Sequence, residues 1–170
     1  MTLRALGIVC ALLLLLCASL AEARGQMFTT SGASTLRELP GIEVVVDSLQ
    51  PELEVGGLNS GVIKIDIEQR LQKAGIVVYP SQAANPSAAK PYLYVTVNAV
   101  ALPHSTDYVL GVRLQVRQML RSPVTDSHIV DATTWDMQNL YVAPADELQS
   151  MRAEVVTFVD QFVEDWTRVH

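Results

Sequence analysis

The chain has 170 residues, with 18 acidic side chains against 12 basic ones and a formal net charge of −6. This acidic balance argues against nucleic acid or an anionic membrane surface as the partner, because both carry negative charge themselves. The length suits one domain whose core is large enough to fold without a disulfide or a metal. We expect no cofactor.

The first 23 residues have the layout of a secretory signal peptide. Arg4 precedes an unbroken apolar run from Ala5 to Ala21, and the small residues Ala21 and Ala23 follow it with one residue between them. We predict cleavage near Ala23 and an exported protein, periplasmic or secreted, with no stable membrane anchor. A retained anchor is the alternative, although the run lies at the lower limit of the about 20 residues that a spanning helix needs.

Both cysteines, Cys10 and Cys17, lie inside this segment, so the mature chain has no disulfide. Residues 24–39 are polar without a clean period, which predicts a flexible leader ahead of a single domain over residues 40–170. β-branched residues between two prolines predict a first strand within residues 40–51, and residues 52–61 read as a loop.

An amphipathic helix is predicted next, capped by Asn59 or Ser60. Its apolar side chains recur at steps of four and three: Ile63, Ile67, Leu71 and Ala74. Gly75 supplies the left-handed backbone that ends a helix, and residues 76–79 form a short strand. A strand, a crossover helix and a second strand make a βαβ unit with parallel strands.

Three more strands are expected after an exposed loop at residues 81–90. Residues 91–103 alternate strictly, residues 108–120 form the longest strand, and the two make an antiparallel hairpin with one face in water. A last strand over 129–142 leaves the direction of Trp135 open. A second amphipathic helix follows Pro144.

The predicted order is β-α-β-β-β-β-α. Two helices with single apolar stripes cover one face of a mixed, mostly antiparallel sheet, which gives an α+β two-layer sandwich. The order of the strands in the sheet stays undetermined.

This order, with "IEQRLQKAGIVV" after the first strand, resembles the amino-terminal domain of the translocation protein TolB and the lipopolysaccharide-assembly lipoprotein LptE. It is also similar to uncharacterised secreted bacterial proteins that end in an amphipathic helix like "VVTFVDQFVEDW". The resemblance implies a role in binding or assembly in the cell envelope and transfers no functional residue. The acylated cysteine of the lipoprotein has no counterpart in the domain.

Catalytic and metal-binding patterns are weak. His104 precedes Asp107, and His128 lies near Asp126 and Asp131, but a zinc site needs three or four ligands at fixed geometry. Asp, Ser and Thr at these positions are typical of hairpin turns. We therefore expect no metal site and no enzyme. A small hydrolase or metal-dependent enzyme that works from the turns of His104 and His128 is the alternative.

The exposed face of the hairpin is the candidate site. Tyrosine and arginine, which are enriched where proteins bind partners, gather on it. Five residues are expected there: Tyr92, Tyr94, Arg113, Gln115 and Arg117. The opposing interpretation is a surface network in which Glu43 and Asp47 pair with the arginines.

The sequence thus predicts a non-catalytic exported module that binds through its open sheet face or a sheet edge. An envelope protein, a glycolipid or a polysaccharide is the expected partner, and the sequence does not choose among them.

Overall fold

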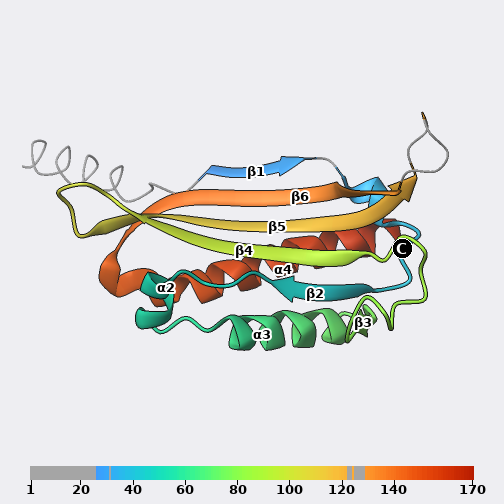
Figure 1. The fold of residues 1–170 in the computed structure, drawn as a ribbon, viewed down its shortest axis with the longest axis horizontal. Coiled ribbons are helices and arrows are strands. Elements are labelled where there is room, and N and C mark those ends of the chain that lie inside the picture. The colour runs from blue at the N-terminus through green and yellow to red at the C-terminus, as the bar shows by residue number, and fades with distance from the viewer. Residues whose placement is uncertain (1–25, 31, 122–123, 125–128) are drawn as a thin grey trace, which may run out of the picture.

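The computed structural model describes residues 26–30, 32–121, 124 and 129–170. The expected signal peptide and His128 lie outside these ranges. The described chain forms one six-stranded sheet with strand order β1-β6-β5-β4-β2-β3, and its two long helices lie on the same side of it (Figure 1). The α+β sandwich predicted from the sequence is confirmed.

The strands are β1 (Gln26–Thr30), β2 (Ile42–Val46), β3 (Val78–Tyr79), β4 (Tyr92–Ala101), β5 (Asp107–Arg121) and β6 (Ile129–Pro144). The α-helices are α2 (Pro51–Val55), α3 (Ser60–Lys73) and α4 (Met151–Val169), and two 3₁₀ helices, η1 (Ala33–Leu36) and η2 (Ala145–Ser150), complete the described elements. β2 pairs in parallel with β3 and β4, whereas β4, β5, β6 and β1 pair antiparallel in succession.

The βαβ unit forms as predicted. The Asn59 side chain caps α3 by accepting a hydrogen bond from the Val62 amide over 3.0 Å. The helix ends at Lys73, and Gly75, two residues further on, has a φ of +80°, the left-handed conformation that a residue without a Cβ adopts most easily. The chain then reverses into β3 beside β2.

One core fills the space between the sheet and the helices. The side chains of β5 alternate as expected, with Leu110, Val112, Leu114 and Val116 buried and Arg113 exposed between them. Trp135, whose direction the sequence left open, also points into this core and is 1% exposed. Its ring lies edge-on to Phe162 of α4, with the centroids 5.1 Å apart.

The expected flexible leader at residues 24–39 contains structure in its described parts, residues 26–30 and 32–39. β1 pairs with β6, and Leu36 and Leu39 are buried in the core. The segment looked featureless because a five-residue edge strand and one 3₁₀ turn are too short to show a period.

The expected loop at residues 52–61 also contains structure. Pro51 begins the short helix α2, which buries Leu53 completely, and Leu58 is buried after it. A helix of little more than one turn owes its stability to such tertiary contacts rather than to helix propensity, so the composition of the segment did not reveal it.

Candidate functional site

The sheet face turned away from α3 and α4 is called the open face here. Register brings the predicted site residues into neighbouring rows: Tyr92 lies opposite Arg117, Tyr94 opposite Gln115, and Thr96 opposite Arg113. The hairpin therefore gathers all five predicted residues on one surface. It does not expose them equally.

Arg117 lies at the centre of this cluster. Its guanidinium carbon is 5.7 Å from the ring centroid of Tyr92 and 5.7 Å from that of Tyr94. Its Nη2 is 2.7 Å from Asp131 Oδ2, the same oxygen that accepts a hydrogen bond from the Tyr92 hydroxyl over 2.8 Å. Two rings and one carboxylate thus hold the guanidinium in a single orientation.

Tyr92 is only 9% exposed, so it offers a partner much less contact area than the sequence suggested. Burial, followed by the hydrogen bond to Asp131, raises the pKa of Tyr92 to about 12. Tyr92 therefore positions Asp131 and Arg117 rather than contacting a partner, and Tyr94 has the more accessible ring. The Tyr94 hydroxyl donates to Asp47 Oδ2 over 2.8 Å, and this bond, more than burial, raises the pKa of Tyr94.

Arg113 forms a bidentate ion pair with Asp136 of β6. Its Nε and Nη2 are each 2.8 Å from a different carboxylate oxygen, and this hydrogen bonding is the main cause that raises the pKa of Arg113. Gln115 donates through Nε2 to Thr133 Oγ1 over 3.2 Å. β6 therefore supplies the hydrogen-bond partners of both residues.

The alternative of a surface network is correct in kind but not in its partners, because Asp136 and Asp131 of β6, rather than Glu43 and Asp47, pair with the arginines. β5 has β6 as its neighbour on one side and β4 on the other, and β2 lies one strand further away. The carboxylates of Asp131 and Asp136 are consequently the nearer partners. Strand order was not available from the sequence, so β6 was missed as part of the site.

Two buried polar atoms beside Tyr92 have no hydrogen-bond partner among the described residues. They are Glu43 Oε2 and Arg117 Nε. Glu43 lies opposite Tyr92 on β2, and Arg117 lies opposite Tyr92 on β5. The same row of the sheet thus keeps one acceptor and one donor without an internal bond.

The other end of the open face is apolar. Val100, Val109 and Val142 form a row across β4, β5 and β6, and Leu140 lies two residues from Val142 on β6. Val100 is 62% exposed, Val142 59% and Leu140 54%. Large aliphatic side chains that cluster and remain in water mark a surface suited to an apolar partner.

The enzyme alternative requires the turns of His104 and His128, and the structure describes only the first. His104 has φ +59° in the bend between β4 and β5 and is exposed, and His128 lies outside the described residues. No group of three or more His, Cys, Asp or Glu side chains among the described residues is placed to hold a metal ion.

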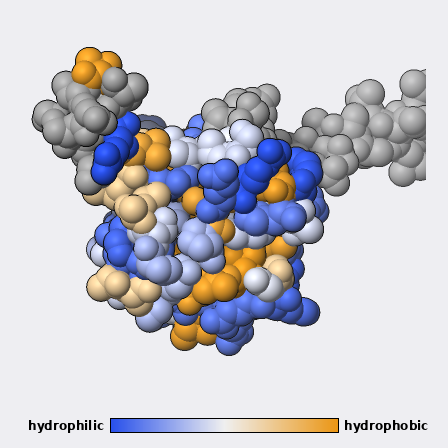
Figure 2. All heavy atoms as spheres, turned by 90° about the vertical axis from the view of Figure 1, so that its right-hand side faces the viewer, coloured by the Kyte–Doolittle hydropathy of each residue, from blue (hydrophilic) through white to orange (hydrophobic). Residues whose placement is uncertain are grey.

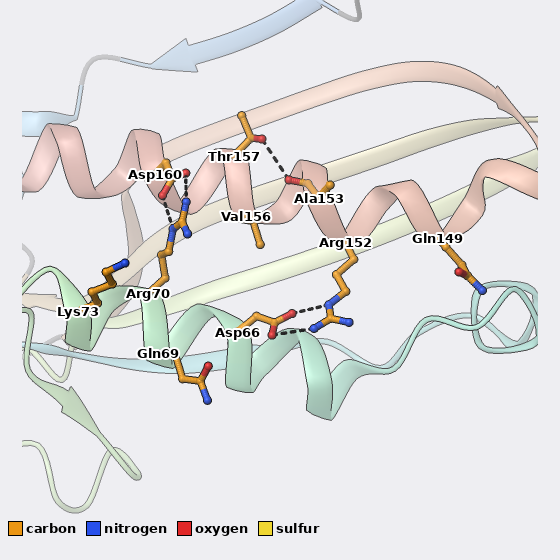
Figure 3. A pocket seen from close by; sticks show the side chains of 10 residues that line it. All are labelled: Asp66, Gln69, Arg70, Lys73, Gln149, Arg152, Ala153, Val156, Thr157 and Asp160. Atoms are coloured by element: carbon orange, nitrogen blue, oxygen red, sulfur yellow. Dashed lines mark hydrogen bonds and ion pairs between the residues drawn. The ribbon is translucent and has the colours of Figure 1, made fainter.

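A groove of about 830 Å³ runs between α3 and α4 on the opposite side of the molecule. Two ion pairs cross it, Asp66 with Arg152 and Arg70 with Asp160, and both are bidentate (Figure 3). Hydrogen bonding from Arg70 lowers the pKa of Asp160. These charges join the two helices, so we assign the groove a structural role.

Apolar side chains also gather at the end of the molecule where α3 and α4 end (Figure 2). A cavity of about 390 Å³ there is lined in part by Ile76, Val77 and Trp166. The His170 ring stacks on Trp166, with the centroids 4.4 Å apart. The polar open face, by contrast, combines directed charges with aromatic rings, and it remains the better candidate site.

No family model and no curated protein matches the chain. Two structures of the PelC dodecamer from Paraburkholderia phytofirmans are similar to it, with 18% and 17% identity and TM-scores of 0.46 and 0.47. Each match covers 82% of this chain, and 97% and 96% of the PelC chains.

A candidate lipoprotein from Caulobacter crescentus CB15 is similar at 13% identity and a TM-score of 0.25, over 78% of this chain and 98% of that one. This resemblance to a lipoprotein is weak and concerns the fold alone. Neither TolB nor LptE is among these three structures. Within the part of the chain that the structure describes, no helix has the length and apolar character needed to cross a membrane.

Proposed function

We propose that this protein is a non-catalytic, exported binding module that captures a partner on the open face of its sheet. The observation that carries the proposal is the fixed position of Arg117 between Tyr92, Tyr94 and Asp131. Binding costs less when the side chains of a surface are already ordered by bonds within the protein, because little side-chain entropy is lost on association. The proposed export rests on the amino-terminal sequence.

The shape of the surface supports the same function. Four neighbouring strands, β6, β5, β4 and β2, contribute side chains to the open face, and both long helices lie on its far side (Figure 1). Arg113 is about half exposed although it is paired. A broad face with fixed polar groups at one end and aliphatic groups at the other matches the mixed composition of protein interfaces.

Photo-crosslinking in intact cells tests the proposal. A photoreactive residue in place of Gln115 on the open face is compared with one in place of Gln72, an exposed glutamine on α3. We expect a discrete crosslinked product from position 115 and none from position 72. Equal products from both positions, or products from position 72 alone, would contradict a binding role of the open face.

A further inference from the structure

The open face carries more carboxylates than cations. Alternation along the strands places five acidic side chains on it, against three guanidinium groups. The acids are Glu43, Asp47, Asp107, Asp131 and Asp136, and the bases are Arg113, Arg117 and Arg121. Arg121 lies four residues beyond Arg117 on β5, which places it about 13 Å away. The face therefore has an excess of two negative charges. One of the acids, Asp107, lies beside the apolar end, two residues from Val109 on β5, so the end that holds the arginines has an excess of one.

Most hydrogen-bond donors of the face are used within the protein, and Arg117 Nε, which has no partner among the described residues, is buried. Both nitrogens of Arg113 that reach Asp136, the Nη2 of Arg117 and the hydroxyls of Tyr92 and Tyr94 all bond to carboxylates. A phosphate or sulfate would have to replace these carboxylates, and the acids would then be left without their cations. Such a replacement is unfavourable, because an unpaired charge in a partly buried site is costly.

Carboxylates, in contrast, remain at the surface. Glu43 is partly exposed, although its Oε2 is itself buried and has no hydrogen-bond partner among the described residues. Each oxygen of a carboxylate accepts more than one hydrogen bond, so Asp47 can accept from a partner as well as from Tyr94. An ammonium or guanidinium group beside Glu43 and Asp47 would pair with these carboxylates and offset the negative charge of this end of the face.

The apolar end of the face determines what else the partner must carry. Val100 lies eight residues from Tyr92 along β4, a distance of about 26 Å in a strand. Val109 lies opposite Val100 on β5, and Val142 and Leu140 lie on the next strand, β6. A single ligand that covers both ends must present cations at one end and aliphatic side chains at the other, over the length of a short helix or strand.

We propose that the partner of the open face is a basic amphipathic polypeptide segment, with lysine or arginine near Glu43 and Asp47 and apolar side chains on the Val100–Val142 row. This inference rests on the proposed function. It selects a protein over an anionic glycolipid, because complementary charge favours the partner that brings cations.

Two synthetic helical peptides serve as probes: one with leucine on one side and lysine on the other, and one in which glutamate replaces every lysine. Calorimetry gives the Kd, and amide chemical shifts show where each peptide binds. We expect the lysine peptide to bind on β2, β4, β5 and β6, more weakly as salt rises, and the glutamate peptide not to bind.

Charge-neutral variants locate the contact. Glu43→Gln with Asp47→Asn should raise the Kd of the lysine peptide about tenfold. The matched control, Glu68→Gln with Glu164→Gln, removes the same charge from the helical side and should leave the Kd within about twofold, which is within the usual scatter of such values. Melting temperatures verify that each variant is folded. A second pair, Val100→Ser with Val142→Ser, should weaken binding of the lysine peptide as well.

The outcomes separate the two proposals. If the glutamate peptide, or a micelle of an anionic glycolipid, binds the open face, the basic-partner inference is wrong and the binding function stands. The same holds if the lysine peptide binds with a Kd that Glu43→Gln and Asp47→Asn do not change. If none of the three probes shifts any amide of β2, β4, β5 or β6, the basic-partner inference is wrong. The binding function is wrong as well if position 115 also gives no crosslinked product.

Discussion

The indole nitrogen of Trp135 donates a hydrogen bond to Asp165 Oδ2 over 2.9 Å, and this bond ties β6 to the last turns of α4. Both side chains are buried, and the other carboxylate oxygen of Asp165 is 3.1 Å from Arg168. A buried carboxylate is thus satisfied on both sides, by an indole from the sheet and by a guanidinium from its own helix.

We expect Asp165→Ala to lower the free energy of unfolding by about 2 kcal/mol, because the buried Trp135 N–H loses its acceptor. Asp165→Asn should cost less, since the amide oxygen still accepts this bond. Urea denaturation followed by tryptophan fluorescence measures both variants. A wild-type midpoint for Asp165→Ala would mean that the indole N–H does not depend on this residue.

Substitution of Gly75 tests the end of α3. Its φ of +80° is strained for any residue with a Cβ, but an added Cβ would have no atom within 4 Å. Gly75→Val should therefore destabilise the domain by about 1 kcal/mol or more through the backbone alone, and Gly75→Asn by less. Equilibrium denaturation distinguishes them. Equal losses for the two variants would point to a steric rather than a conformational cost.

The raised pKa of Tyr92 predicts that the fold loses stability at alkaline pH. Its pKa is about 12 in the folded protein against an ordinary value of 10.0, so folding favours the protonated phenol. The resulting stability is complete below about pH 10 and is lost as the pH rises towards 12. Tyr92→Phe should flatten this decline. Tyrosinate absorbance against pH is the direct readout, with Tyr141→Phe as a control, because Tyr141 also has a pKa of about 12.

The ion pair between Arg70 and Asp160 should make the free energy of unfolding fall as the pH is lowered, whereas Tyr92 makes it fall as the pH is raised. The pKa of Asp160 is lowered from its ordinary value of 3.8, so the carboxylate stabilises the fold above that value. This contribution disappears as the pH falls through the lower pKa of the folded state. Asp160→Asn should reduce stability at neutral pH and make the loss of stability at acidic pH smaller. Melting temperatures measured over a range of pH give this dependence. The same acidic decrease as in wild type would exclude the pair as a source of stability.

Replacement of Arg113 and Arg117 by glutamine tests separately whether these arginines stabilise the fold and whether they bind the partner. Arg113→Gln with Arg117→Gln leaves Asp131 and Asp136 without these cations, so we expect a lower melting temperature and a more acidic open face. If the partner is basic, binding of the lysine peptide should persist or strengthen in this variant. A loss of binding with an intact fold would show that the arginines themselves contact the partner.

The periodicities that involve many residues were sufficient to predict the elements that build the core. Alternation in β5 placed Arg113 and Arg117 on one face, and the apolar repeat of α3 ended at Gly75 as expected. The neighbours of β5 could not be predicted, because strand order depends on contacts between residues far apart in sequence. Asp131 and Asp136 therefore appeared as turn and strand residues rather than as partners of the arginines. Burial of Tyr92 was missed for the same reason.

The pairing of β1 with β6 has a kinetic consequence. Gln26 is opposite Leu140, so this edge of the sheet joins segments separated by more than a hundred residues. Contacts of such long range slow folding, because the loop must close before the strands gain anything from their hydrogen bonds. While the chain emerges from a ribosome, β1 has no strand to pair with until β6 has been synthesised. Completion of this edge is therefore a late event that requires nearly the whole chain.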